Sequence, residues 1–254
     1  MTAGGAVARI RLGLRLFGAL AWLLACIGPS ALARVRNVPH NPWPRRFLRG
    51  VAHIFGIAVA IRGERAPGRL LLLANHVSWI DILALSAASG CAFVGHDGLA
   101  RVPFLRWLCR QNDTVFVARH DKAGIAAQVE QLRRALMEMG AVTLFPEGTT
   151  GNGDTLLPFK SSLLGALEPL PEGITVQPVW LDYGPDVAAT AWVGDEPGMD
   201  NFRRVLGRAR PAAVAVHFLP ALDGAALASR KTIASAARQS IAWAMSPAVP
   251  LTEA

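Results

Sequence analysis

Residues 70–81 read LLLLANHVSWID, and this stretch decides the fold that we expect. Its first five residues are apolar, as in a strand that is buried on both faces of a sheet. The polar residues Asn75 and His76 follow at once, and a segment that predicts a helix opens a few residues later. Because ligands of α/β proteins bind outside the carboxyl ends of the strands, we expect His76 at the functional edge of a sheet.

Short apolar runs and helical patterns alternate along the rest of the chain. Strands are expected at residues 70–74, 92–95, 114–118, 141–145, 175–181, 189–193 and 213–219. Apolar residues recur at spacings of three and four between residues 125 and 139, which predicts an amphipathic helix that ends at Gly140. A last helix is expected from about residue 224 to residue 245. This order predicts an α/β fold with a mixed, largely parallel sheet flanked by helices.

The N-terminal part predicts a membrane anchor. Residues 16–33 carry no charge, and arginines flank them on both sides. The run is borderline for a span, because about 20 residues are needed to cross a hydrocarbon core of ~30 Å. We expect Gly28 and Pro29 to end its helix early. A second apolar run, residues 51–61, is too short to span, and the prolines between the two runs predict a turn or loop.

Three interpretations of this N-terminal part fit its sequence. A cleaved secretory signal has an arginine-rich start, an apolar middle and a small-residue end such as Ala31-Leu32-Ala33. The others are a single membrane span and a pair of helices that enters one leaflet and returns. An anchor, residues 1–62, would precede one catalytic domain, residues 63–254, because no repeat or low-complexity linker divides the remainder.

The composition restricts the class of partner. The 254 residues are 52% hydrophobic and 17% charged, and the net charge is +8. The positive surplus favours an anionic partner, either a nucleic acid or an anionic bilayer surface. We expect no nucleic acid, because the sequence has no zinc finger, RNA-binding signature or basic stripe interleaved with aromatic residues. The three cysteines form no CxxC pair, so neither a disulfide framework nor a zinc site is expected.

His76 and Asp81 form a candidate acid–base pair. An imidazole beside a helix start is biased toward its neutral, basic form, because the positive end of the helix dipole disfavours imidazolium. Asp81 lies about one and a half helical turns away, so it meets the ring only if the first turn is irregular or the ring bends back. In that case its carboxylate fixes the tautomer and stabilises the imidazolium formed by proton transfer. By itself, such a pair is more typical of a helix-capping histidine with a surface carboxylate than of a catalytic site.

A second polar segment, FPEGTT at residues 145–150, follows another predicted strand. Pro146 cannot continue a central strand and Gly148 allows a tight turn, so the chain must bend here. The bend leaves Glu147 and two threonine hydroxyls at the same edge of the sheet as His76. Turn chemistry explains the proline and the glycine, but it does not explain the carboxylate between them.

Together the two segments resemble the catalytic motifs of the glycerolipid acyltransferase family, to which lysophosphatidic acid acyltransferases belong. The family pattern is His, four residues and Asp, followed later by Phe-Pro-Glu-Gly-Thr, and both parts are complete here. The resemblance extends over roughly residues 70–182. It implies that His76 is the general base, that Asp81 orients it, and that Glu147, Gly148 and Thr149 belong to the acceptor pocket.

Other segments are similar to the family in the same way. Arg119 matches an arginine that contacts the acceptor phosphate, and Lys160, in the segment Pro-Phe-Lys, matches a second cation near the acceptor. Residues 176–179, VQPV, resemble the family's fourth block. Two departures concern the acceptor head group: His96 stands where many relatives carry lysine, and a serine pair, Ser161-Ser162, replaces a common glycine.

The resemblance implies transfer of a fatty acyl group from an acyl thioester to the hydroxyl of a lysolipid. Direct transfer is expected, because no activated serine or cysteine nucleophile is evident. The expected reaction converts 1-acylglycerol-3-phosphate to phosphatidic acid. A lyso-ornithine lipid or another lysophospholipid is the alternative acceptor, and a non-catalytic membrane lipid-binding protein is an alternative of another class.

The partners follow from this reaction. They are membrane lipids, the lysolipid acceptor and a cosubstrate, either acyl-CoA or acyl carrier protein, and neither a metal nor another cofactor is expected. Since such donors are cytosolic, we favour an anchor over a cleaved signal. The expected location is the cytoplasmic face of the inner (plasma) membrane.

Overall fold

A computed structural model of the protein describes residues 3–38, 41–96, 102–112, 114–117 and 125–246. Within these residues, seven strands form one sheet in the order β1-β7-β6-β2-β5-β3-β4. All neighbours are parallel except β6 and β7, which are antiparallel. The strands are β1 (Ile57–Arg62), β2 (Arg69–Ala74), β3 (Ala92–His96), β4 (Val115–Val117), β5 (Ala141–Leu144), β6 (Ile174–Asp182) and β7 (Ala212–Phe218). The predicted mixed, largely parallel sheet is confirmed.

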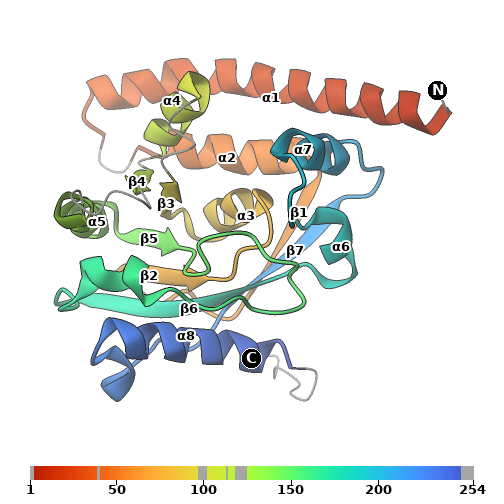
Figure 1. Cartoon of the computed structure of the whole chain (residues 1–254). Coiled ribbons are helices and arrows are strands. Elements are labelled where there is room, and N and C mark those ends of the chain that lie inside the picture. Colours follow the sequence, from red (N-terminus) through yellow and green to blue (C-terminus); the bar gives the residue numbers. More distant parts are fainter. Residues whose placement is uncertain (1–2, 39–40, 97–101, 113, 118–124, 247–254) are drawn as a thin grey trace.

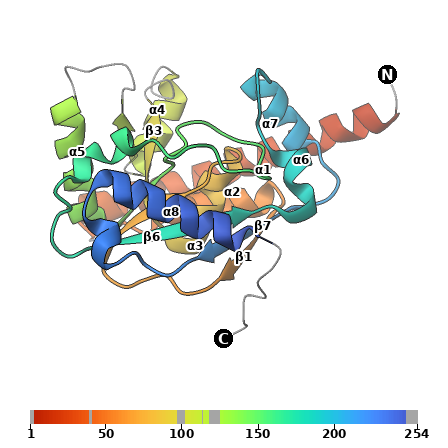
Figure 2. The same cartoon turned by 60° about the horizontal axis from the view of Figure 1, so that its bottom comes forward.

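Helices cover both faces of this sheet (Figure 1). In Figure 1, α2 and α3 lie between the sheet and α1, and α8 lies on the opposite face. Figure 2, which brings that opposite face forward, shows α8 lying across β6. The helices are α1 (Ala3–Val35), α2 (Trp43–Ile54), α3 (Ile80–Ser89), α4 (Pro103–Gln111), α5 (Ile125–Met139), α6 (Val187–Thr190), α7 (Gly198–Leu206) and α8 (Arg230–Ala244).

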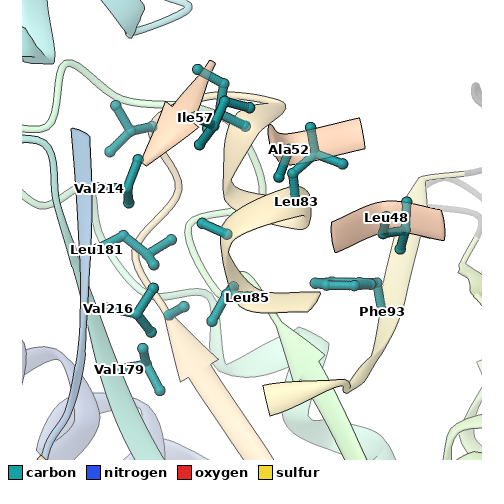
Figure 3. Close-up of a cluster of buried hydrophobic side chains, with 14 of the residues drawn as sticks. Leu48, Ala52, Ile57, Leu83, Leu85, Phe93, Val179, Leu181, Val214 and Val216 are labelled. Atoms are coloured by element: carbon teal, nitrogen blue, oxygen red, sulfur yellow. The ribbon is translucent and has the colours of Figure 1, made fainter. Parts of the chain in front are cut away.

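The central strand β2 supplies the core on both faces, because successive side chains of a strand point in opposite directions. Leu70 and Leu72 pack toward α2 and α3, whereas Leu71 and Leu73 pack toward α5 and α8. All four side chains are fully buried. Figure 3 shows the first of these faces, where α3 lies between residues of β6 and β7 and residues of α2. This packing fixes the end of β2, from which the polar segment at residue 75 departs.

Most of the predicted elements are present, and one is wrong. The predicted strand at residues 189–193 is instead the end of the short helix α6 and a loop. Arg204 donates hydrogen bonds to the carbonyls of Ala189 and Ala191, at 2.6 and 2.9 Å. In a strand of the sheet, these carbonyls would instead accept hydrogen bonds from a neighbouring strand. The sequence analysis also missed α2, α4, α7 and β1, and a short 3-10 helix at Gly224–Leu227 precedes α8, which begins later than expected.

The expectation that Gly28 and Pro29 end the first helix is wrong, because α1 continues to Val35. A proline removes one hydrogen bond from the ladder, and here the following turn is held from outside. Asn41 donates to the Ser30 carbonyl at 3.2 Å, and Ala33 is buried. Among the described residues, α1 is the one helix long and apolar enough to cross a membrane.

The chain after α1 returns to the sheet rather than forming a separate unit. The apolar run at residues 51–61 is divided by Gly56, whose φ of 69° lies in the left-handed region. The part before Gly56 ends α2, and the part after it becomes β1, which pairs with β7. A strand of the sheet therefore lies within the stretch predicted as an anchor, residues 1–62.

Three sets of contacts join α1 to the rest of the molecule. In its N-terminal half, Arg15 donates to the carbonyls of Leu206, the last residue of α7, and of Arg208 just beyond it, at 2.6 and 3.3 Å. In its middle, the Trp22 indole donates to the Phe47 carbonyl of α2 at 3.2 Å. Near its end, Arg34 donates to the Gln111 side chain of α4. Thus α1 is held against the domain from Arg15 to Arg34.

Candidate active site

His76 lies in a non-helical segment between β2 and α3, and Asp81 lies in the first turn of α3. Since α3 begins only at Ile80, the chain before it can fold back over the helix start. The His76 Nδ1 atom is 2.7 Å from the Asp81 Oδ2 atom. The structure therefore brings the predicted pair together through the irregular first turn that this spacing required.

Asp81 is fully buried and has many hydrogen-bond donors around it. Its Oδ2 atom also accepts from the backbone N–H groups of Val77 and Ser78, at 2.7 and 3.0 Å. Its Oδ1 atom accepts from the Tyr183 hydroxyl. The start of α3 adds a favourable dipole for a negative charge. Both oxygens of this buried carboxylate therefore have hydrogen-bond partners, as buried polar groups require.

The His76 ring is held on one side and open on the other. It stacks on the Phe145 ring, with centroids 4.1 Å apart and planes 18° apart. Its side chain remains 20% exposed, whereas that of Asp81 is not exposed. With Nδ1 facing Asp81, Nε2 is the ring nitrogen left for a substrate, and no other described residue hydrogen-bonds it.

Glu147 links the second motif to the first. Its Oε1 atom accepts from the His76 N–H at 2.9 Å, and its Oε2 atom accepts from the Leu157 N–H at 3.1 Å. The side chain is only 2% exposed. Burial raises the pKa of Glu147, and the two backbone hydrogen bonds oppose this rise. The carboxylate thus holds the backbone of the base and the loop after the turn in fixed positions.

Three other predicted site residues, Gly148, Thr149 and Lys160, lie in or near this turn. Gly148 is buried and has a φ of 71°, and its N–H donates to the Phe145 carbonyl at 3.0 Å. Thr149 is exposed beside it. A methyl group added at Gly148 would meet the Lys160 Nζ atom at 3.2 Å, so the Lys160 ammonium lies against the turn. Arg119 lies outside the described residues, as does the side chain of His96.

The sequence analysis missed two residues that complete the site. The Asn75 side chain forms two hydrogen bonds with the backbone of Leu181, at 3.1 and 2.7 Å, and so joins the ends of β2 and β6. Tyr183, just after β6, contacts Asp81. The strand predicted at residues 175–181 places Tyr183 just after a strand end, but no motif marks this residue, and the sequence pattern does not show which strands are neighbours.

Other reactive groups are separate from this site. The three cysteines are free, and buried Cys91 accepts a hydrogen bond from Thr143 at 2.9 Å. Burial raises the pKa of Cys91, which keeps it in the unreactive thiol form. No group of three or more potential metal ligands occurs among the described residues. The arrangement is one that can support general-base chemistry, because Asp81 orients the His76 ring and Nε2 has no hydrogen-bond partner among the described residues.

Comparison with known proteins agrees with this arrangement. A family model described as Acyltransferase matches residues 58–182. The lyso-ornithine lipid O-acyltransferase of Rhodobacter capsulatus is 33% identical over 212 residues, which cover 80% of this chain and 76% of that protein. The 1-acyl-sn-glycerol-3-phosphate acyltransferase of Neisseria gonorrhoeae is 33% identical over 108 residues, which cover 42% of each chain.

The fold has a close counterpart among crystal structures. PlsC, the 1-acyl-sn-glycerophosphate (LPA) acyltransferase of Thermotoga maritima, superposes with a TM-score of 0.64 at 18% identity, over 96% of this chain and 100% of that one. The chain therefore belongs to the acyltransferase family. It is an enzyme of acyl transfer, as the two motifs implied. Its family and its exposed apolar helix α1 indicate that it associates with a membrane.

Proposed function

We propose that this enzyme transfers a fatty acyl group from an acyl thioester to the free hydroxyl of a lysolipid, with His76 as the general base. The observation that carries this proposal is the His76–Asp81 contact of 2.7 Å, which leaves Nε2 available at the site. A protein that only bound lipid would need neither an oriented imidazole nor a buried carboxylate partner.

The proposed reaction has two steps at one nitrogen. The Nε2 atom of His76 takes the hydroxyl proton as the lysolipid oxygen attacks the thioester carbonyl carbon, and a tetrahedral oxyanion forms. The carbon–sulfur bond then breaks, and the imidazolium returns the proton to the departing thiolate. Asp81 stabilises the imidazolium in between and keeps the ring aimed.

The turn at residues 145–149 is the proposed place of the acceptor. Glu147 accepts a hydrogen bond from the His76 backbone there, and the positive φ of Gly148 allows the tight turn. Thr149 and Lys160 place polar groups beside this turn. Lys160 and Arg119 are the cations that we propose for the acceptor's anionic group.

For the acceptor we propose a lyso-ornithine lipid first. The Rhodobacter capsulatus relative with that name aligns with 80% of this chain. The second candidate is 1-acylglycerol-3-phosphate, which is supported by the name of the Neisseria gonorrhoeae relative over 42% of the chain. The donor is an acyl thioester of coenzyme A or of acyl carrier protein, and no other cofactor takes part in the proposed mechanism.

A panel of acceptors tests this proposal. Purified enzyme would be incubated with one labelled acyl thioester, as the CoA or carrier-protein form, and with lyso-ornithine lipid or 1-acylglycerol-3-phosphate in turn. We expect thiol release that depends on the lysolipid, with a diacylated product. His76→Ala should lower the rate roughly 10²- to 10⁴-fold, the usual contribution of a general base.

A matched histidine variant makes this test specific. His53 is exposed on α2, so His53→Ala should leave transfer unchanged. Full turnover in His76→Ala, or thiol release without any lysolipid, would contradict the assignment.

For the membrane, we propose that α1 lies in the plane of one leaflet and does not cross it. Because α1 contacts the folded domain at both Arg15 and Arg34, 19 residues apart, a helix crossing the membrane would draw α4 and α7 into the hydrocarbon. Exposed apolar side chains recur along α1 every three or four positions and suit this orientation: Val7, Ile10, Leu14, Phe17, Leu20, Leu24 and Ile27. We place the enzyme on the cytoplasmic face of the inner membrane, where the thioester donors are.

A further inference from the structure

Tyr183 occupies a fixed position next to the general base. It follows β6, and β6 pairs in parallel with β2, which leads to His76. The two strand ends are joined by the paired hydrogen bonds between the Asn75 side chain and the Leu181 backbone. Asn75 directly precedes His76, and Leu181 lies two residues before Tyr183. This connection sets where the phenol lies relative to the base.

The two oxygens of Asp81 have different partners. Oδ2 receives His76 Nδ1 and two backbone N–H groups. Oδ1 receives only the Tyr183 hydroxyl among the described residues. The Tyr183 side chain is 3% exposed and lies in the apolar core beside α3. Without the phenol, Oδ1 would be a buried acceptor with no partner.

We propose that Tyr183 is the positioning residue of the general base: its hydroxyl holds Asp81 so that Oδ2 faces His76 Nδ1 and Nε2 faces the acceptor. This inference rests on the proposed function, in which His76 takes the proton of the lysolipid. Tyr183 touches no reacting atom and acts through Asp81.

A phenol suits this position because it donates a hydrogen bond without adding a charge. A lysine or arginine here would neutralise Asp81 and weaken its effect on the imidazolium. Burial, and the nearby Asp81 charge, hold the pKa of Tyr183 well above its usual range, so the group remains a donor at every pH of interest. The Asp81 carboxylate thus interacts with both the phenol and the His76 imidazole.

Tyr183→Phe removes only the hydroxyl and tests the proposal directly. Because hydrogen bonds to charged groups are strong, we expect their loss to lower the plateau of kcat/KM roughly 10- to 100-fold. More of the Asp81 charge then acts on the imidazole and favours its protonated form. The rise of kcat/KM with pH should therefore move to higher pH, an effect that loss of packing alone does not produce.

Ile233→Ala is the matched control for stability. Ile233 is a buried residue of α8, in the core on the other face of the sheet. This variant should lower Tm without moving the pH profile. An unmoved profile with an unchanged plateau in Tyr183→Phe, whatever its Tm, would overturn the proposal.

A spectroscopic measurement keeps the proposal testable if Tyr183→Phe folds poorly. Tyr183 is the only tyrosine of the chain, so biosynthetic labelling with 3-fluorotyrosine gives one ¹⁹F resonance. We expect this resonance to shift with pH at the same midpoint as kcat/KM, and the shift to vanish in Asp81→Asn and in His76→Ala. A resonance that does not follow the titration in the wild type would overturn the proposal.

The two measurements separate this inference from the proposed function. Absence of acyl transfer to any lysolipid by the wild type would contradict the proposed function. The pH-dependent shift of the ¹⁹F resonance, and its loss in Asp81→Asn and His76→Ala, require no turnover, so they test the coupling of Tyr183 to the His76–Asp81 pair in either case.

Discussion

Two buried carboxylates surround His76, and they act on different parts of it. Asp81 contacts the ring, whereas Glu147 contacts the backbone N–H of the same residue, at 2.7 and 2.9 Å. The ring contact bears on proton transfer. The backbone contact, with its second bond to Leu157, bears on where the whole residue lies relative to the turn. Substitutions of the two should therefore fail in different ways.

Glu147→Gln tests the backbone role. The amide keeps one acceptor oxygen but presents an NH₂ group to the second backbone N–H, so one buried donor loses its partner. We expect acyl transfer to fall at least tenfold, because an unsatisfied buried group costs about 1–3 kcal/mol and displaces the base or the loop. Initial rates at saturating donor measure this, and Glu130→Gln, at an exposed position of α5, is the control.

The same variant has a defined pH signature. Because burial raises the pKa of Glu147 in the folded state, the folded protein binds this proton more readily than the unfolded chain does. The stability of the wild type relative to Glu147→Gln should be greatest below the unfolded pKa of about 4.3, and it should decline as pH rises through the raised value. Denaturant unfolding at several pH values measures the difference. A difference that grows with pH would contradict this assignment.

At this scale the sequence was most informative where a strand end coincided with a motif. His76, Asp81 and Glu147 were found because each belongs to a polar segment directly after an apolar run. Tyr183 follows a strand as well, but a lone tyrosine belongs to no motif, and its contact with Asp81 joins positions 102 residues apart. Such contacts depend on strand order, which the sequence pattern does not specify.

At the scale of elements, the contact between α1 and α2 depends on small residues. A methyl group added at Gly50 would lie 2.1 Å from the Trp22 indole nitrogen, and one added at Gly18 would lie 3.1 Å from the Ile54 side chain. The Trp22 indole also donates to the Phe47 carbonyl. The two helices thus pack closely at Gly50, where the indole covers the backbone.

Gly50→Ala should separate these helices. The added methyl group must displace the indole, and overpacking of this kind costs about 1–3 kcal/mol. Gly28→Ala is the matched control, since nothing lies within 4 Å of a methyl group at that position of α1. We expect a lower Tm in detergent for Gly50→Ala. For Gly28→Ala we expect an unchanged or slightly higher Tm, because alanine favours a helix over glycine by up to ~1 kcal/mol. Equal Tm values for the two variants would contradict the packing.

The elements that sequence reasoning missed have physical causes. Prolines at residues 39, 42 and 44 suggested a loop, but a proline is favoured at the start of a helix, and α2 begins there. α4 and α7 span nine residues each, too few for a clear apolar period. The strands were easier to predict, because burial on both faces of the sheet requires continuous apolar runs.

At the scale of the whole molecule, most of the exposed large apolar side chains belong to α1 and α4. α4 lies against α1 and α2 across a groove lined by Leu23, Ile27, Trp43 and Trp107, among others. Phe104 and Trp107 of α4 are 55% and 39% exposed, and two arginines of the same helix are exposed beside them. Figure 1 shows α4 near α1, on the side away from α8. This combination of aromatic and basic side chains suits the head-group region of an anionic bilayer.

Replacing both aromatic residues tests this surface. Phe104→Ser with Trp107→Ser should weaken binding to vesicles that contain anionic lipid roughly tenfold, because partial burial of two aromatic side chains is lost. Trp243→Ser is the control, since Trp243 is 59% exposed on α8, across the sheet. Flotation of the purified proteins with vesicles measures both. A larger loss of vesicle binding in the Trp243 variant would indicate that the membrane contacts the α8 side, and it would contradict this prediction.

The attachment of α1 to the domain also bears on how the enzyme meets its acceptor. In the proposed orientation, flat on one leaflet, the enzyme would encounter lysolipid by lateral diffusion, so the relevant concentration would be a number of molecules per unit area. Diluting the lysolipid with inert lipid in the same vesicles should then slow the reaction, whereas diluting the vesicles with buffer should not, once the enzyme is fully bound. On this proposal, the contacts that hold Arg15 and Arg34 of α1 against the domain make the reaction depend on surface density.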